Sequence, residues 1–307
     1  MPPRSSKPNA VTEAASPCGD VVLLGNLQSG KTTIFRRLAR EGVREIGLAG
    51  SSRSVTRGEI RPRGIERLPG ALARLVRRRR SRRTIADDPD CRLGLVDTPG
   101  TSTLIPEDEE ELLVRDVLLA RPPAALLVVA NARDPRRSLA LVAHAAELGL
   151  PTVLAVNMID EAHAAGVDVD CGLLESQLGI DVVPTVATQG TGVDKLPELL
   201  ERARVPARPA RLPHRVAAPL AEIAGILGEL DAPAALAQLL LVGDERARDR
   251  VREDLGPEAL ARVDAVVERA SSSSEMPLDA LLADAFHAAG ARLAARAVTR
   301  TATGRRH

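Results

Sequence analysis

The 307-residue sequence has almost no aromatic side chains, because Trp and Tyr are absent and Phe35 and Phe286 are its two phenylalanines. A hydrophobic core must therefore be built from Leu, Val, Ile and Ala, within a hydrophobic content of 44% and a charged content of 27% that are typical of a globular protein. Lysine is scarce as well: Lys7, Lys31 and Lys195 are the three in the chain, and Arg carries the remaining positive charge. This scarcity draws attention to Lys31.

Several classes of protein are excluded by what is missing. The three cysteines, Cys18, Cys91 and Cys171, have no C-x-x-C spacing and the five histidines are scattered, which argues against a structural zinc site. No run approaches the roughly 20 apolar residues that a membrane span needs, and the start lacks the apolar core of a signal peptide. A net charge of +1 gives no overall attraction to nucleic acid. We therefore expect a cytoplasmic protein with reduced thiols, no transmembrane segment and no nucleic-acid partner.

Residues 18–204 alternate between short apolar runs and helical patterns. Strands are expected at Val21–Leu24, Arg92–Val96, Ala124–Ala130, Thr152–Val156 and Asp181–Val183, and helices at Thr32–Arg40, Ser138–Leu148 and Val193–Arg202. Continuous apolar strands separated by helices are typical of a parallel sheet that is covered on both faces. The fold class predicted is therefore α/β, with a doubly wound, mainly parallel sheet whose ligands bind at the carboxyl ends of its strands.

The alternation of apolar runs and helical patterns ends after residue 204. Residues 205–215 hold three prolines and no periodicity, which is typical of a linker. A small all-α domain is expected at 216–298, with helices at Ala218–Leu230, Pro233–Leu241, Glu245–Leu255, Glu258–Ala270 and Leu278–Val298. The polar segment 1–17 and the tail 299–307 are expected to be disordered.

The nine residues after the first expected strand, GNLQSGKTT, fit the phosphate-binding pattern G-x-x-x-x-G-K-[ST]. Successive backbone N–H groups in such a turn, followed by a helix N-terminus, form an anion site. Lys31 would reach the β- and γ-phosphates and the Thr32 hydroxyl would bind Mg²⁺. The candidate binding residues are Gly25, Asn26, Leu27, Gln28, Ser29, Gly30, Lys31, Thr32 and Thr33.

A second motif, Asp97-Thr98-Pro99-Gly100, follows the strand at Arg92–Val96. An aspartate at a strand end near the phosphates is the expected partner of Mg²⁺. The Gly100 amide would face the γ-phosphate. Together with the phosphate loop, this motif predicts a P-loop NTPase of the small-GTPase kind.

A third motif, Asn157-Met158-Ile159-Asp160, is similar to the guanine-reading sequence N-K-x-D with Met in place of Lys. A carboxylate at Asp160 can accept hydrogen bonds from guanine N1–H and its exocyclic amine, two donors that adenine lacks. The alternative is that Asp160 caps the helix that follows. The segment Val186-Ala187-Thr188 occupies the place of the S-A-K loop whose backbone touches guanine.

Together these segments resemble the GTPase domain and helical spacer of the bacterial ferrous-iron transporter B (FeoB) family, over roughly residues 20–270. The likeness rests on GNLQSGKTT, VDTPGTSTL, VLAVNMIDEA and the stretch from Pro233 to LLLVGDE. The resemblance implies binding of GTP and GDP with Mg²⁺, and slow GTP hydrolysis linked to ferrous iron uptake. The membrane-spanning part of that family is not in this sequence, so a separate membrane transporter is implied as the partner, with the chain at the inner face of the plasma membrane. A homo-oligomer is compatible with the sequence.

The chain departs from that family at functional positions. Thr56 is the best match to the family's switch threonine, so it is a candidate both for catalysis and for binding Mg²⁺. Lys31 and Gly100 are the other catalytic candidates. Thr32 and Asp97 are the other candidate metal ligands. Gln28 stands where an Asn helps to hold potassium in the family, which leaves potassium activation open. With Thr101 in place of a water-orienting glutamine, and without an arginine finger, turnover is expected near or below roughly 10⁻⁴–10⁻² s⁻¹.

The insertion at about 60–90 carries the run Arg77–Arg83, which fits a solvated loop, a contact with anionic lipid or an acidic partner, or RNA binding. The leading hypothesis is a GTP-dependent switch. The alternatives are a GTP sensor with negligible hydrolysis and an RNA- or ribosome-associated GTPase that uses the arginine run. The apolar face of the last helix, including Leu278, Leu282 and Leu293, is either a docking surface or packs within the helical domain.

Overall fold

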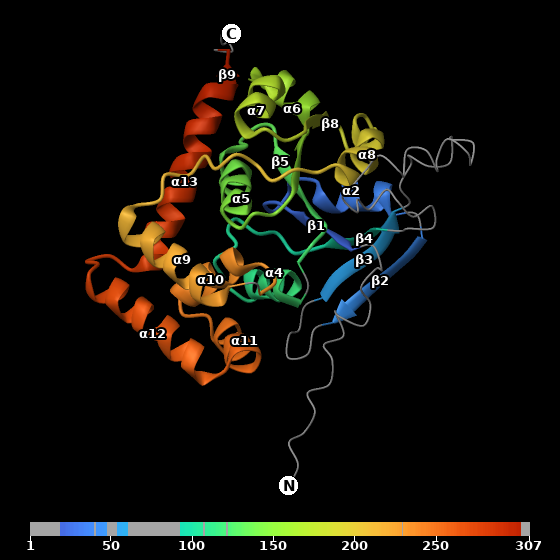
Figure 1. Cartoon of the computed structure of the whole chain (residues 1–307). Helices are drawn as coiled ribbons and strands as arrows, with labels where there is room; N and C mark the ends of the chain where they lie inside the picture. The colour runs from blue at the N-terminus through green and yellow to red at the C-terminus, as the bar shows by residue number, and fades with distance from the viewer. Residues whose placement is uncertain are drawn as a thin grey trace, which may run out of the picture.

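The computed structural model describes residues 19–39, 41–47, 54–60, 93–106, 108–120, 122–228 and 230–301. Within these residues a seven-stranded sheet with the order β2-β3-β4-β1-β5-β6-β8 forms the centre of the molecule (Figure 1). Its strands are β1 (Asp20–Leu24), β2 (Glu41–Gly47), β3 (Ser54–Ile60), β4 (Leu93–Asp97), β5 (Ala125–Asn131), β6 (Thr152–Asn157) and β8 (Val182–Thr185). The five strands that the sequence predicts are all present, and they pair in parallel.

The edge formed by β2 and β3 was not expected from the sequence. Both strands run antiparallel, β2 to β3 and β3 to β4. Their residues include Arg, Glu and Gly, so they lack the continuous apolar pattern of the central strands. Edge strands often carry charged side chains, and this explains why the pattern did not reveal them.

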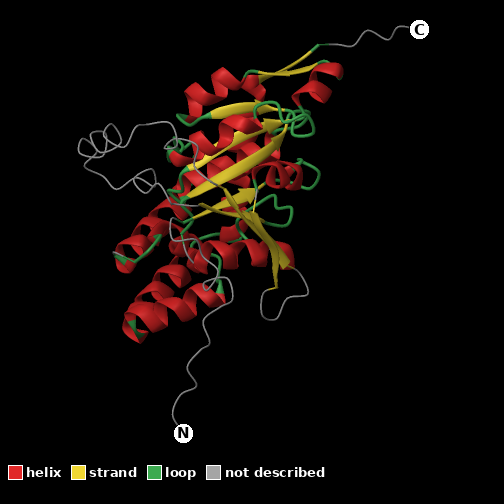
Figure 2. Cartoon of the chain, turned by 90° about the vertical axis from the view of Figure 1, so that its right-hand side faces the viewer, coloured by secondary structure: helices red, strands yellow, loops and turns green. Residues whose placement is uncertain are grey.

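Helices cover both faces of the sheet (Figure 2). One face holds α2 (Lys31–Leu38), the 3₁₀ turn η2 (Val193–Lys195) and α8 (Leu196–Glu201), whose apolar side chains pack on Val21 and Leu23 of β1. The other face holds α4 (Glu109–Ala120), α5 (Arg136–Glu147), α6 (Ile159–Ala164) and α7 (Cys171–Leu178), which pack with Val22 and Leu24. This alternation along β1 is the period-two pattern of a strand buried on both sides.

The helical unit that follows is formed by α9 (His214–Leu227), α10 (Pro233–Leu241), α11 (Glu245–Leu255) and α12 (Pro257–Ser272). These helices share one buried apolar cluster. Helix α9 begins at His214, within the expected linker and before the expected start at Ala218, and Pro219 lies inside it. A buried ion pair between Arg115 of α4 and Asp244, the N-cap of α11, joins this unit to the sheet domain.

The last helix, α13 (Leu278–Ala297), packs along α5 of the sheet domain (Figure 1). Its residues Leu278, Leu282 and Ala289 belong to the cluster of the helical unit, and Leu293 belongs to the core of the sheet domain. The apolar face of α13 is therefore covered within the chain. The alternative of a docking surface on this helix is therefore wrong. Packing within the helical domain is confirmed for the first part of the helix, and Leu293 packs in the sheet domain instead.

The chain after α13 also differs from the expectation. The sequence predicted a helix up to Val298 and a disordered tail after it. Residues Val298–Arg300 instead form β9, which pairs antiparallel with β7 (Val167–Val169). Thr301 continues this contact, because its N–H donates to the carbonyl of Gly166 at 2.8 Å. The expected disordered segment 1–17, the run Arg77–Arg83 and the cysteines Cys18 and Cys91 lie outside the described residues.

Candidate functional site

The loop between β1 and α2 has the backbone geometry that its glycines predict. Gly25 has φ 156°, Gly30 has φ 85°, and Gln28 has φ 61°, which is rare for a residue with a side chain. A Cβ on Gly25 would lie 2.5 Å from the carbonyl oxygen of Val129, and one on Gly30 would lie 2.2 Å from Nδ2 of Asn157. No side chain fits at either glycine, so the loop closes tightly before the N-terminus of α2.

Lys31, Thr32 and Asp97 meet at the mouth of this loop. The Thr32 hydroxyl donates to Oδ2 of Asp97 at 2.7 Å, and Nζ of Lys31 lies 3.5 Å from Oδ1. Lys31 and Asp97 are both buried, and Oδ1 of Asp97 has no hydrogen-bond partner within the described residues. A hydroxyl and a carboxylate with one oxygen that accepts no hydrogen bond supply the hard oxygen donors that Mg²⁺ prefers. These residues therefore fit a magnesium ion beside a phosphate.

The segment Asp97–Gly100 is fastened to the phosphate loop by backbone and side-chain contacts. The Thr98 hydroxyl donates to the carbonyl of Leu23 at 2.7 Å, and the N–H of Thr101 donates to the carbonyl of Gly25 at 3.0 Å. A Cβ on Gly100 would lie 2.8 Å from the side chain of Leu27. The two motifs predicted from sequence are thus brought into direct contact.

Thr56 lies on strand β3, not in a loop, and it is the direct ladder partner of Asp97 on β4. Directly opposed residues of an antiparallel pair point to the same face of the sheet. Thr56 is half-buried and on the same side of the sheet as the carboxylate. This register brings the threonine chosen from sequence next to the candidate Mg²⁺ ligand.

Asn157, at the end of β6, connects three segments. Its Nδ2 donates to the carbonyl of Ser29 at 2.9 Å, while its Oδ1 accepts from the Thr185 hydroxyl at 3.1 Å and from the N–H of Ala187 at 2.9 Å. The side chain is fully enclosed, with 1% of its surface exposed. Asn157 therefore holds the phosphate loop against the segment after β8. The sequence named it as a base-contacting residue and did not reveal this connecting role.

Asp160 takes no part in these contacts. The helix α6 is capped at Met158, which has φ 63°, so Asp160 lies inside the first turn and is not the N-cap residue. Its side chain is exposed, and within the described residues it makes no hydrogen bond or ion pair. The helix-cap alternative for Asp160 is therefore wrong, and the carboxylate is available to a ligand.

The segment Val186-Ala187-Thr188 follows β8 as the sequence predicts. The N–H of Val186 donates to the carbonyl of Thr191 at 3.0 Å, which closes the segment into a tight turn. Arg37 of α2 donates to the carbonyl of Thr188. Because Ala187 is bonded to Asn157, the turn is held beside Met158 and Asp160.

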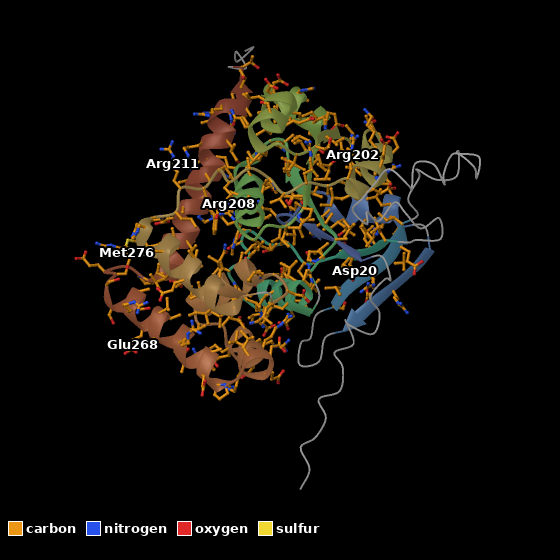
Figure 3. All side chains as sticks on the ribbon, viewed as in Figure 1. Asp20, Arg202, Arg208, Arg211, Glu268 and Met276 are labelled. Carbon is orange, nitrogen blue, oxygen red and sulfur yellow. The ribbon has the colours of Figure 1, made fainter. Side chains whose placement is uncertain are left out.

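Several features near the site are not apparent from the sequence. Arg57 of β3 forms a partly buried ion pair with Asp20, the first residue of β1, which is labelled in Figure 3. Oδ1 of Asn26 and Oγ of Ser29 are buried in the loop without a hydrogen-bond partner in the part of the chain that is described. A hollow beside the loop is lined by Arg137 on the first turn of α5 and by the acidic residues 108–111. Arg137 follows the carboxyl end of the central strand β5, a position that it shares with Arg136.

Two negative findings concern the described residues alone. They contain no group of His, Cys, Asp or Glu side chains that could by itself hold a metal ion. Among them, too, no helix has both the length and the apolar character needed to cross a membrane.

Comparisons with known proteins agree on one family. The family model described as "Ferrous iron transport protein B" matches residues 79–200, a range that begins after the phosphate loop. The Fe(2+) transporter FeoB of Salmonella typhimurium is 32% identical over 184 residues, which cover 59% of this chain and 20% of that protein. A fusion of Fe(2+) transport protein A and Fe(2+) transporter FeoB from Porphyromonas gingivalis is 34% identical over 182 residues, covering 59% of this chain and 18% of it. The chain thus spans about a fifth of the length of these relatives.

Solved structures extend the likeness to the helical unit. A mutant of S. thermophilus NFeoB bound to GDP has a TM-score of 0.70 at 23% identity, over 92% of this chain and 100% of that one. The cytosolic domain of L. pneumophila FeoB has a TM-score of 0.69 at 22% identity, over 92% and 100% of the two chains. The predicted fold class, a P-loop GTPase-like sheet followed by helices, is confirmed.

Proposed function

We propose that the chain carries a G domain of the FeoB type, which binds GTP and GDP with Mg²⁺ and hydrolyses GTP slowly. The observation that carries the proposal is the meeting of three loops at one edge of the sheet. The phosphate loop, the Asp97 segment and the Asn157 segment are joined by the contacts of Thr101 with Gly25 and of Asn157 with Ser29. Each loop follows the carboxyl end of a strand, where ligands of such sheets bind.

In this proposal the backbone N–H groups of the loop and the Lys31 ammonium hold the β- and γ-phosphates. Thr32 and Asp97 would hold Mg²⁺, and Thr56 on the adjacent strand would be a further ligand. When bound, the ion neutralises charge on the phosphate oxygens. Gly100 offers its N–H to the γ-phosphate, so that loss of this phosphate on hydrolysis would release the segment that follows.

Nucleotide affinity tests the phosphate loop. We expect Lys31→Ala to abolish GTP and GDP binding in isothermal titration calorimetry, because it removes the ammonium group that would contact the phosphates at the N-terminus of α2. Lys195→Ala is the matched control, since it removes the other described lysine, which lies in η2. Micromolar GTP affinity in Lys31→Ala would overturn the phosphate-loop assignment.

Base selectivity tests Asp160. Asp160→Asn is expected to lose the preference for guanine and to bind xanthosine nucleotides, because an amide can donate to the O2 carbonyl that replaces the exocyclic amine of guanine. A site built on such hydrogen bonds can discriminate by roughly 10⁴-fold. Glu161→Gln, an exposed acid in the same helical turn, should keep guanine selectivity. Guanine preference that survives in Asp160→Asn would remove Asp160 from the site.

The hydrolysis step separates a switch from a sensor. Multiple-turnover assays with [γ-³²P]GTP are expected to give a rate of roughly 10⁻⁴–10⁻² s⁻¹, the range of unassisted and cis-assisted GTPases. Tight GTP binding without phosphate release would favour the sensor. The GTP hydrolysis rates of wild type and Gln28→Asn, each measured in potassium and in sodium, test whether potassium activates hydrolysis in this chain. Equal rates in all four assays would exclude potassium activation.

We further propose that this GTPase regulates ferrous iron uptake through a membrane-spanning partner, and therefore acts at the inner face of the plasma membrane. The support is that the relatives are named as Fe(2+) transporters. Uptake of ⁵⁵Fe²⁺ by cells that produce Lys31→Ala should fall relative to cells that produce wild type at equal protein level. Unchanged uptake in a strain that depends on this chain would contradict the link to iron.

A further inference from the structure

A hollow of about 490 Å³ opens beside the phosphate loop. Its walls are Asn26 and Leu27 of the loop, residues 100–102 after β4, the acidic residues 108–111 that lead into α4, and Arg137. Because Gly100 and the loop both line it, the hollow lies on the side of the site where the terminal phosphate of a bound nucleotide would sit.

Arg137 is the one cationic residue among the described residues that line this hollow. Its side chain is exposed, and within the described chain no hydrogen bond or ion pair holds it. The neighbouring Arg136 differs, because its Nε lies 2.9 Å from Oδ1 of Asp134. Two arginines thus stand side by side on the first turn of α5, one engaged in an ion pair and the other free beside the phosphate loop.

The acidic residues of the hollow have roles of their own. Oδ1 of Asp108 accepts from the N–H groups of Glu110 and Glu111 at 2.8 and 2.9 Å and so caps α4. Glu111 is buried, and one of its carboxylate oxygens lies 3.4 Å from the Thr101 hydroxyl. A γ-phosphate that enters this region meets several negative charges, so a nearby cation is needed to offset the charge.

Thr101, the residue after Gly100, cannot assist hydrolysis. The Thr101 hydroxyl donates to the carbonyl of Thr103 at 2.5 Å and is almost fully buried, with 2% of its surface exposed. It is therefore bound within the chain and cannot orient an attacking water molecule. A guanidinium, in contrast, can contact two phosphate oxygens at once and remains charged at any pH of interest.

We propose that Arg137 is a catalytic residue of the GTPase, contacting the γ-phosphate as an arginine supplied by the same chain. The inference rests on the proposed function. In the reaction a water oxygen bonds to the γ-phosphorus while the bond from that phosphorus to the bridging oxygen breaks; the bridging oxygen leaves with GDP, and the water proton passes to the released phosphate. Charge grows on the γ- and bridging oxygens during this step, and the Arg137 guanidinium stabilises it.

Single-turnover hydrolysis of prebound GTP tests the proposal. GTPases with an arginine in cis turn over at about 10⁻² s⁻¹ and those without one at about 10⁻⁴ s⁻¹. Arg137→Ala and Arg137→Gln should therefore be slowed about 100-fold, with the dissociation constants of GTP and GDP changed less than about threefold. Added guanidinium chloride at millimolar concentration should restore part of the rate of Arg137→Ala. Arg136→Ala, which removes the ion-paired neighbour, should hydrolyse GTP within about twofold of wild type.

Each other outcome counts against Arg137. Unchanged hydrolysis in Arg137→Ala and Arg137→Gln overturns the inference while leaving the proposed function intact. A parallel loss of GDP affinity and thermal stability, without rescue by guanidinium, shows that Arg137 only balances the acidic residues and also overturns it. Absence of GTP binding by the wild type is the separate failure of the proposed function.

Discussion

Asn157 donates a hydrogen bond at 2.9 Å to the backbone carbonyl of Ser29, a residue 128 positions earlier in the chain. The two lie on different loops, one after β6 and the other after β1, and β5 lies between these strands in the sheet. The same side chain accepts two hydrogen bonds from the segment after β8. One buried amide therefore fixes the distance between the phosphate loop and the segments expected to bind the base.

We expect Asn157→Ala to weaken both folding and nucleotide binding. The substitution leaves the N–H of Ala187 and the carbonyl of Ser29 unpaired in a buried site, which costs about 1–3 kcal/mol per group in the free energy of unfolding. GTP affinity should fall at least about tenfold because the two loops lose their fixed spacing. Urea denaturation and calorimetric titration measure the two effects.

Asn131 provides the matched control for that experiment. It ends the neighbouring strand β5, directly opposite Asn157 in the ladder, and its Oδ1 accepts only a local bond from the N–H of Arg133 at 2.9 Å among the described contacts. Asn131→Ala should leave GTP affinity within about twofold of wild type. Equal losses in the two variants would mean that the link between Asn157 and the phosphate loop has no special importance.

The central strands and the three loops could be predicted from sequence because each signal is local. Buried parallel strands such as Ala125–Asn131 are continuous apolar runs, and the loop glycines are required by backbone angles that other residues avoid. Secondary structure and motif order then place Lys31, Asp97 and Asp160 at the same edge of the sheet. The predicted fold class followed from these local signals.

What could not be predicted depends on contacts between distant segments. The pairing of β3 with β4, which sets Thr56 opposite Asp97, has no apolar pattern and depends on tertiary context. The apolar face of α13 indicated burial but not its partner, which is α5. Likewise, nothing in the sequence distinguishes Arg137 from Arg136; the difference arises from Asp134, which pairs with only one of them in the described chain.

The contact between α13 and α5 can be tested with two glycines. A Cβ on Gly290 of α13 would lie 2.3 Å from the carbonyl oxygen of Arg136 and 2.7 Å from the backbone nitrogen of Ala140. Gly290→Ala should therefore separate the helices and lower the free energy of unfolding by about 1–3 kcal/mol. Gly225→Ala in α9, where nothing lies within 4 Å, should instead raise it by about 0.5–1 kcal/mol. Thermal denaturation of both variants checks the opposite signs.

Cys171 is expected to resist alkylation. Burial raises the pKa of its thiol to about 11, and the nearby carboxylates of Asp170, Asp168 and Glu175 add to the effect. Since the thiolate is the reactive form, a rise from 9.0 to about 11 slows the reaction with iodoacetamide at pH 8 about 100-fold. A variant with Cys18 and Cys91 changed to Ser isolates this thiol, and unfolding in urea should restore the rate. Rapid labelling of the folded variant would contradict the prediction.

His144 of α5 lies between the sheet domain and the helical unit. Its Nε2 is 2.5 Å from Oε1 of Gln238 on α10, and its ring stacks on Phe286 of α13 at a centroid distance of 4.1 Å. Only 2% of the residue is exposed. Burial lowers the pKa of His144 from 6.5 to about 4, against a smaller opposing effect of the Gln238 hydrogen bond. The neutral ring therefore belongs to the folded state.

This shift predicts a loss of stability in acid. Between pH 6.5 and about 4 the unfolded chain binds a proton at His144 that the folded chain does not, so the free energy of unfolding falls as the pH falls through this window. A shift of this size corresponds to about 3 kcal/mol, fully lost below pH 4. Urea denaturation at pH 7, 5.5 and 4.5 should show a steeper decline for wild type than for His144→Leu, which cannot titrate at this position. Glu147, whose pKa burial raises, titrates in both proteins and cancels in the difference. Parallel declines in the two proteins would show that His144 is protonated in the folded state as readily as in the unfolded one.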